Sequence, residues 1–126
     1  MLDKIIKGLA YLFSALLLVN GIQWLAVPAT TAEGFGMPLL EGIGRSTQIG
    51  DLAAFFIVAG GMGLAGLLRK DKTLLLTPAA LVGGAAVFRT LAWAVHGAPF
   101  ATQFIVIEIV MLAAFLGARS RLGKSG

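Results

Sequence analysis

The sequence predicts an all-α integral membrane protein, an up-and-down four-helix bundle that forms a single transmembrane domain over residues 1–126. Hydrophobic residues make up 58% of the chain and charged residues 13%, whereas about a quarter of the residues of a soluble domain are charged. The mean hydropathy is +0.92. Four stretches approach the roughly 20 apolar residues that a helix needs to cross a hydrocarbon core about 30 Å thick. These predicted spans cover about residues 8–27, 47–68, 73–95 and 100–118.

The first span contains no acidic or basic residue and ends at Pro28, whose ring disfavours helical geometry in the residue before it. Lys4 and Lys7 followed by an apolar run also resemble the start of a cleaved signal peptide. The run continues through Val27, beyond the roughly 7–15 apolar residues of a cleaved segment. We therefore expect a retained membrane span.

A long outer loop is expected over residues 28–46. It is rich in Gly and Pro, yet it contains Phe35, Met37, Leu39 and Leu40. Apolar side chains at these positions predict that the loop lies against the membrane surface or caps the bundle.

The other three spans each contain one ionisable residue. Asp51 lies near the start of the second span, Arg89 lies in the third and Glu108 lies in the fourth. Between the last two spans, the His96–Pro99 segment reads HGAP, a composition typical of turns. The last two spans are therefore expected to form an antiparallel hairpin.

The basic residues predict the orientation in the membrane. Eight of the ten Lys and Arg residues flank the same ends of the spans, and by the positive-inside rule that side is the cytoplasm. Both termini are therefore predicted to be cytoplasmic. Trp24 and Trp93 fall toward the outer ends of their spans and are expected in an interfacial aromatic belt. The eight residues are Lys4, Lys7, Arg69, Lys70, Lys72, Arg119, Arg121 and Lys124.

Arg89 and Glu108 lie at matching depth. Arg89 precedes Gly97 by eight residues and Glu108 follows Pro99 by nine, which places them roughly 12 and 13 Å below the outer surface at a rise of about 1.5 Å per residue. A charged side chain in hydrocarbon costs about 2.5–3.5 kcal/mol on insertion scales. We therefore expect the two side chains to pair, directly or through water.

The role of this pair is left open by the sequence. It is either a structural staple between the third and fourth spans or part of a functional site, and Arg89 could instead extend its long stem toward the surface. Asp51 is either a second acidic partner of Arg89 or a cap of the second span that lies near the interface and meets Arg45.

Other polar residues also belong to the outer half. By the same arithmetic Asn20 lies about 10 Å deep, Gln23 about 6 Å, and Asp51 about 6 Å inside the second span, while Gln103 approaches Glu108. We predict one polar cluster that binds a ligand or stabilises the bundle, with no catalytic residue assigned. Its members are Asn20, Gln23, Asp51, Arg89, Gln103 and Glu108.

The composition excludes several kinds of chemistry. The chain has no cysteine, so it offers no disulfide, thiolate metal site or iron–sulfur cluster. Its one histidine, His96, lies in the outer turn and cannot form a haem pair or a metal site alone. No cofactor or metal is expected, and the positive charge at the span ends does not indicate a nucleic-acid partner.

Small residues recur at intervals of four in the second and third spans. This spacing lets helix backbones approach closely, either inside the monomer or between copies of a dimer. The pairs are Ala59/Gly63, Gly61/Ala65, Ala79/Gly83 and Ala80/Gly84.

The order of several short motifs resembles the DoxX-like family of small four-helix bacterial membrane proteins, in particular an uncharacterised subgroup. The motifs are QWLAVP, GFGMPLL, Arg45, Gly50-Asp51, VFRTLAW and VIEIV, and the resemblance covers about Gly8 to Ala118. It implies a compact bundle in the bacterial cytoplasmic (inner) membrane. Members of the wider group are associated with quinol or sulfur-compound oxidation or with oxidative-stress complexes, and distant relatives include sterol isomerases and receptor-assembly chaperones.

Two functions are compatible with these features. The first is a non-catalytic bundle whose polar cluster binds a lipophilic ligand, such as a quinone, or supports a membrane complex or homo-oligomer, with membrane lipids as further partners. The alternative is a small intramembrane isomerase or oxidoreductase in which Glu108 is the acid or base and Arg89 orients it toward a lipid-like substrate. Proton-coupled transport ranks last, because no pair of broken helices is visible.

Overall fold

A computed structural model describes residues 1–122, and this part of the chain contains α-helices and no β-strand. Four of the helices are long and apolar enough to cross a membrane, as predicted. A fifth, short helix lies in the segment expected to be a loop. The helices are α1 (Leu2–Ala26), α2 (Pro28–Gly34), α3 (Ile43–Arg69), α4 (Lys72–His96) and α5 (Thr102–Arg121).

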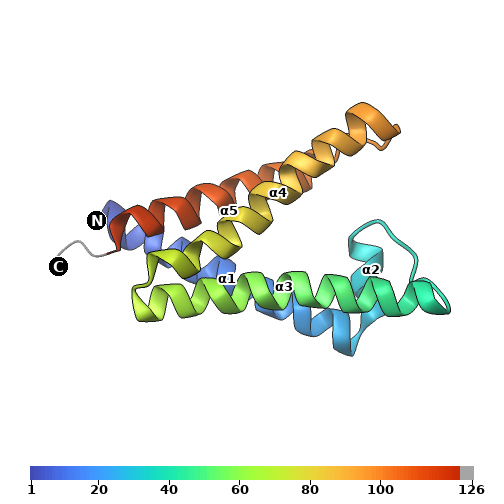
Figure 1. Ribbon diagram of the computed structural model, residues 1–126, viewed down its shortest axis with the longest axis horizontal. Coiled ribbons are helices and arrows are strands. Elements are labelled where there is room, and N and C mark those ends of the chain that lie inside the picture. Colours follow the sequence, from blue (N-terminus) through green and yellow to red (C-terminus); the bar gives the residue numbers. More distant parts are fainter. Residues whose placement is uncertain (123–126) are drawn as a thin grey trace.

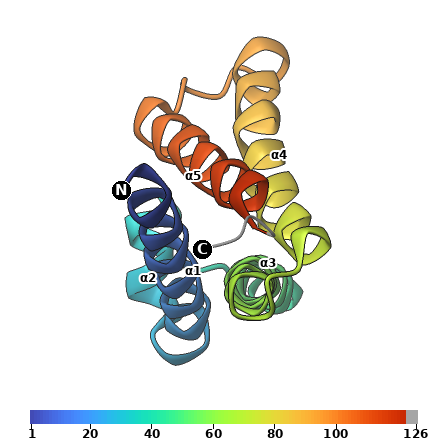
Figure 2. The same ribbon diagram turned by 90° about the vertical axis from the view of Figure 1, so that its left-hand side faces the viewer.

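The long helices form two antiparallel pairs, α1 with α3 and α4 with α5 (Figure 1). The pairs are joined by contacts of α3 with α4 and of α1 with α5. We call the end that holds the N-terminus, the α3–α4 turn and the end of α5 the terminal end, and the other the α2 end. Figure 1 shows the pairs diverging toward the α2 end, and Figure 2 shows α4 on the far side of α5 from α1.

The helices extend beyond the predicted spans because hydropathy marks only their apolar part. α1 begins at Leu2 and includes the charged residues Asp3, Lys4 and Lys7, which a helix accommodates once it leaves hydrocarbon. Lys124 lies outside the described residues. The other three long helices differ from the predicted bounds at both ends, and α5 begins at Thr102, later than the predicted residue 100.

The segment 28–46 differs most from expectation, since it contains α2 and the start of α3. Pro28 is the first residue of α2, a position at which proline's fixed φ suits a helix and its missing N–H costs nothing. The non-helical connection is therefore reduced to residues 35–42.

α1 and α3 approach closely at Gly60. A Cβ atom built on Gly60 would lie 2.6 Å from the backbone oxygen of Ser14 and 2.7 Å from the backbone nitrogen of Leu18. The Ser14 hydroxyl donates to the Ala10 carbonyl at 2.8 Å, so it is satisfied within α1. Only glycine permits this backbone-to-backbone contact.

The small-residue pairs divide between the inside and the outside of the bundle. On α3, Ala59 and Gly63 are buried, whereas Gly61 has no neighbouring atom where a Cβ would lie. On α4, Ala79 is buried and Ala80 is exposed. Packing inside the monomer therefore accounts for the pair Ala59/Gly63.

A two-residue turn reverses the chain between α3 and α4. Lys70 adopts a left-handed conformation with φ of 55° and ends α3. Asp71 then caps α4, because its Oδ1 accepts hydrogen bonds from the backbone N–H groups of Thr73 at 2.9 Å and Leu74 at 3.3 Å. Such a cap satisfies two of the free N–H groups at the start of a helix.

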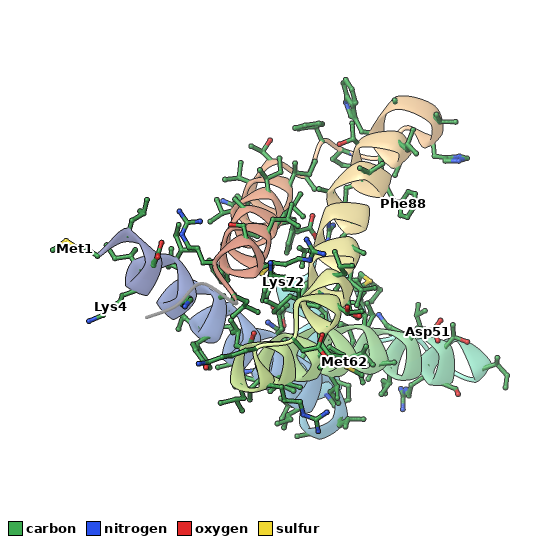
Figure 3. The ribbon with its side chains drawn as sticks, turned by 60° about the vertical axis from the view of Figure 1, so that its left-hand side comes forward. Met1, Lys4, Asp51, Met62, Lys72 and Phe88 are labelled. Atoms are coloured by element: carbon green, nitrogen blue, oxygen red, sulfur yellow. The ribbon has the colours of Figure 1, made fainter. Side chains whose placement is uncertain are left out.

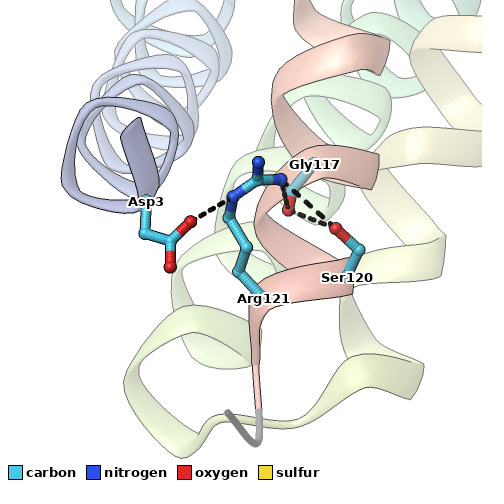
Figure 4. Close-up of polar contacts among 4 residues, drawn as sticks. All are labelled: Asp3, Gly117, Ser120 and Arg121. Atoms are coloured by element: carbon cyan, nitrogen blue, oxygen red, sulfur yellow. Dashed lines mark hydrogen bonds and ion pairs between the residues drawn. The ribbon is translucent and has the colours of Figure 1, made fainter. Parts of the chain in front are cut away.

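Two arginines tie the last turns of α5 to the rest of the terminal end. The Nε of Arg121 donates to Oδ1 of Asp3 at 2.6 Å, and its Nη1 donates to the Gly117 carbonyl at 3.1 Å (Figure 4). The Nε of Arg119 donates to the Lys72 carbonyl at 3.1 Å. The end of α5 is therefore joined to the first turn of α1 and the first turn of α4.

Replacing Gly60 with leucine tests the α1–α3 contact. We expect Gly60→Leu to lower the free energy of unfolding by about 1–3 kcal/mol, the usual cost of overpacking, because the backbones must separate. Gly50→Leu is the matched control, since Gly50 lies on α3 with no atom near its Cβ position. Thermal unfolding in detergent measures both variants, and equal midpoints would contradict the close approach.

Candidate functional site

Arg89 on α4 and Glu108 on α5 form an ion pair in the half of the hairpin nearer the α4–α5 turn. The Nε of Arg89 donates to both carboxylate oxygens of Glu108, at 3.1 Å each. The Glu108 side chain is 9% exposed and that of Arg89 is 34% exposed. The matching depths on an antiparallel hairpin bring the two together, as the sequence predicts.

The protein contacts only part of the guanidinium of Arg89. Its Cζ lies 4.5 Å from the ring centroid of Phe104, within the range of a cation–π contact. Its two Nη nitrogens have no hydrogen-bond partner within residues 1–122, although a guanidinium carries N–H donors on all three nitrogens. Arg89 is thus fixed in place while most of its donors stay available.

Phe35, in the connection after α2, lies at the centre of an aromatic cluster. Its ring stacks on that of Phe104 at a centroid distance of 5.4 Å and an interplanar angle of 15°. It also lies 5.9 Å from Trp24 and 5.4 Å from Phe56. One loop residue therefore joins α1, α3 and α5 at the α2 end and reaches the ring that contacts Arg89.

The expectation that Trp24 lies in an interfacial aromatic belt is wrong. Trp24 is fully buried, and its Nε1 has no hydrogen-bond partner among the described residues. Phe35 covers it, and Ala32 of α2 is buried in the same core. Trp93 is half exposed and contacts Phe100 edge to face at 5.2 Å, so only Trp93 is placed as an interfacial residue would be.

Gln48 holds the connection between α2 and α3, and sequence reasoning missed it. It is buried, its Oε1 accepts from the Leu40 N–H at 2.8 Å, and its Nε2 donates to the Pro38 carbonyl at 3.1 Å. Nothing in the sequence distinguishes this amide from the exposed polar residues beside it.

The structure brings together four of the six residues of the predicted cluster, in two separate pairs. Arg89 pairs with Glu108, while Asn20 and Gln23 line a separate groove of about 310 Å³ between α1 and α2. Gln103 is exposed on α5. The other residues that line the groove are Val27, Thr30, Thr31, Gly34 and Phe35.

Asp51 meets neither of its two expected partners. α3 begins at Ile43, so Asp51 lies within the helix rather than at its start. The Asp51 side chain is exposed. The Nε of Arg45 donates to the Leu40 carbonyl at 2.9 Å, and Arg89 binds Glu108. Figure 3 shows Asp51 on the part of α3 that lies beyond the crossing with α4.

The site combines a buried carboxylate, a partly exposed guanidinium with free donors, and aromatic rings. This combination suits an apolar molecule that carries an oxygen acceptor. Scans against protein-family models, curated proteins and solved structures found no match to this chain.

A double-mutant cycle measures how strongly the ion pair stabilises the bundle. Arg89→Met leaves a buried carboxylate without its cation and is expected to lower the free energy of unfolding by about 3 kcal/mol. Arg89→Met/Glu108→Met replaces both charges with apolar side chains and should recover most of that loss. Unfolding in detergent gives the four values of the cycle. Additive effects would show that the two side chains act independently.

Proposed function

We propose that this protein is an integral protein of the bacterial cytoplasmic membrane, related to the DoxX-like family, with both termini in the cytoplasm. Four long apolar helices support the membrane location. Seven of the eight basic residues that predict the cytoplasmic side belong to residues 1–122, and these seven lie toward the terminal end. In this orientation, α2 and the Arg89–Glu108 pair belong to the outer half of the membrane.

We further propose that the site around Arg89 binds a lipophilic molecule with a polar oxygen acceptor, such as a quinone, and that this binding is not catalytic. The observation that carries the proposal is that the Arg89 guanidinium is fixed in position but only partly hydrogen-bonded. Glu108 and Phe104 contact it, while its Nη donors have no partner within residues 1–122. In a membrane few groups other than a lipid or a lipophilic ligand could accept these hydrogen bonds.

The arrangement of Glu108 favours binding over catalysis. Both of its carboxylate oxygens accept from Arg89, and the side chain is almost fully buried. An isomerase or oxidoreductase that used Glu108 as acid or base would need the carboxylate within hydrogen-bond reach of its substrate. The exposed part of the pair is the guanidinium, which suits recognition of an acceptor.

Cysteine labelling tests the orientation, because the natural chain has no cysteine. In intact bacterial cells, a membrane-impermeant maleimide is expected to label Ser46→Cys, at the α2 end, and to spare Thr73→Cys, at the terminal end. Both positions are exposed at the starts of helices. After the cells are lysed, both variants should react. Labelling of Thr73→Cys in intact cells would reverse the proposed orientation.

The variant Arg89→Lys separates ligand binding from structural pairing. Lysine keeps a cation opposite Glu108 but lacks the Nη donors, so binding of a short-chain benzoquinone is expected to weaken about tenfold while the fold is kept. Quenching of tryptophan fluorescence by the quinone gives the affinity in detergent.

Arg45→Lys is the matched control, since Arg45 lies at the same end but is exposed. Its quinone affinity should equal that of the natural chain. The proposed site would be rejected for this ligand if Arg89→Lys and Arg45→Lys changed the quinone affinity equally. It would also be rejected if the natural chain did not bind the quinone.

A further inference from the structure

A second groove lies between α3 and α4 in the half of the bundle that includes the terminal end. It has a volume of about 430 Å³, within the range of about 300–1,000 Å³ typical of small-molecule sites. All of its α3 residues lie along one side of that helix. The lining residues are Ile57, Val58, Gly61, Met62, Ala65, Arg69 and Leu74.

Small side chains and the geometry of the turn leave this space open. α4 departs from α3 after the turn at Lys70 and Asp71, and Leu74 is the α4 residue that reaches the groove. Gly61 has no atom within 4 Å of its Cβ position. Figure 3 shows Met62 where α3 passes α4.

The groove has the length and polarity of one lipid chain. Ile57 and Arg69 are twelve residues apart, which is about 18 Å along the helix. Half of a hydrocarbon core about 30 Å thick is about 15 Å. Apart from Arg69, every lining side chain is apolar. The groove therefore extends across about one leaflet and ends at a single cation.

The guanidinium of Arg69 is available for an anion. At the terminal end, Arg119 donates to the Lys72 carbonyl and Arg121 pairs with Asp3, whereas Arg69 is exposed and has no hydrogen bond or ion pair within residues 1–122. The nearest acidic residue in sequence, Asp71, is the cap of α4.

We propose that this groove binds one acyl chain of an anionic phospholipid, with the lipid phosphate on Arg69. Basic residues at the ends of membrane helices attract anionic lipids, and Lys70 and Lys72 flank the same turn and add positive charge. This site is independent of the quinone site at Arg89 and shares with the proposed function only the location in a membrane.

A second copy of this chain fits the groove less well. Copies in one membrane share their orientation, and a two-fold contact brings the same patch of both copies together at the same depth. Two Arg69 side chains would then meet with like charge. An anionic headgroup at that position is attracted instead.

The test compares phosphatidylglycerol with phosphatidylcholine on the full chain in detergent. Native mass spectrometry is expected to show retained phosphatidylglycerol, and titration of this lipid should raise the unfolding temperature more than phosphatidylcholine does. Arg69→Gln should weaken phosphatidylglycerol binding about fivefold by removing one cation. Gly61→Leu should reduce binding by a similar factor, because the leucine side chain fills the groove.

Two controls match these variants. Arg45→Gln removes an exposed arginine at the α2 end, and Gly50→Leu adds the same side chain to α3 at a position with free space. Both should bind phosphatidylglycerol as the natural chain does.

Three results would overturn the proposal. The first is equal binding of the two lipids, and the second is an equal effect of Arg69→Gln and Arg45→Gln. The third is a Gly61→Leu variant that turns a dimer into a monomer without changing lipid binding, which would assign the groove to a second copy. The Arg89 proposal has its own readout, quinone affinity, so the two can fail separately.

Discussion

The burial of a carboxylate among apolar helices constrains the arrangement of the α4–α5 hairpin. Glu108 is tolerable inside the bundle because Arg89 compensates its charge, and this requirement sets how α5 lies along α4. Phe104 precedes Glu108 by about one helical turn, so the same register brings its ring beneath the guanidinium. Phe35 then stacks on Phe104, which ties the position of the connection after α2 to the ion pair.

The sequence was sufficient to predict the four long helices and the meeting of Arg89 with Glu108. Charge-free runs identify apolar helices directly, and the helical rise converts residue number into depth. The segment after Pro28 was not predictable by the same means. The buried Trp24 contacts Phe35, which lies in the connection after α2, and a tryptophan near the end of an apolar span has the same local pattern in the core or at an interface.

The six residues predicted to form one polar cluster do not all meet, because the depth of a residue along its helix does not specify the direction in which its side chain points. Gln103 and Glu108 are five residues apart, which turns their side chains about 140° from each other around α5 at 3.6 residues per turn. Asn20 and Gln23, three residues apart, differ by about 60° and share one groove. The same arithmetic places Phe104 about 40° from Glu108. Helical periodicity could therefore have predicted Phe104 as a residue of the site, whereas hydropathy and charge could not.

The contact between Asp3 and Arg121 joins residues 118 positions apart, and it bears on the order of events during biosynthesis. A ribosome delivers the α1–α3 pair long before the last turn of α5, so the early helices must wait in the membrane without their final neighbour. The tie between α1 and α5 at the terminal end can form only after Arg121 has been synthesised. Proteases that remove unassembled membrane proteins would therefore meet an α1 surface not yet covered by α5 on any chain that stalls before that helix.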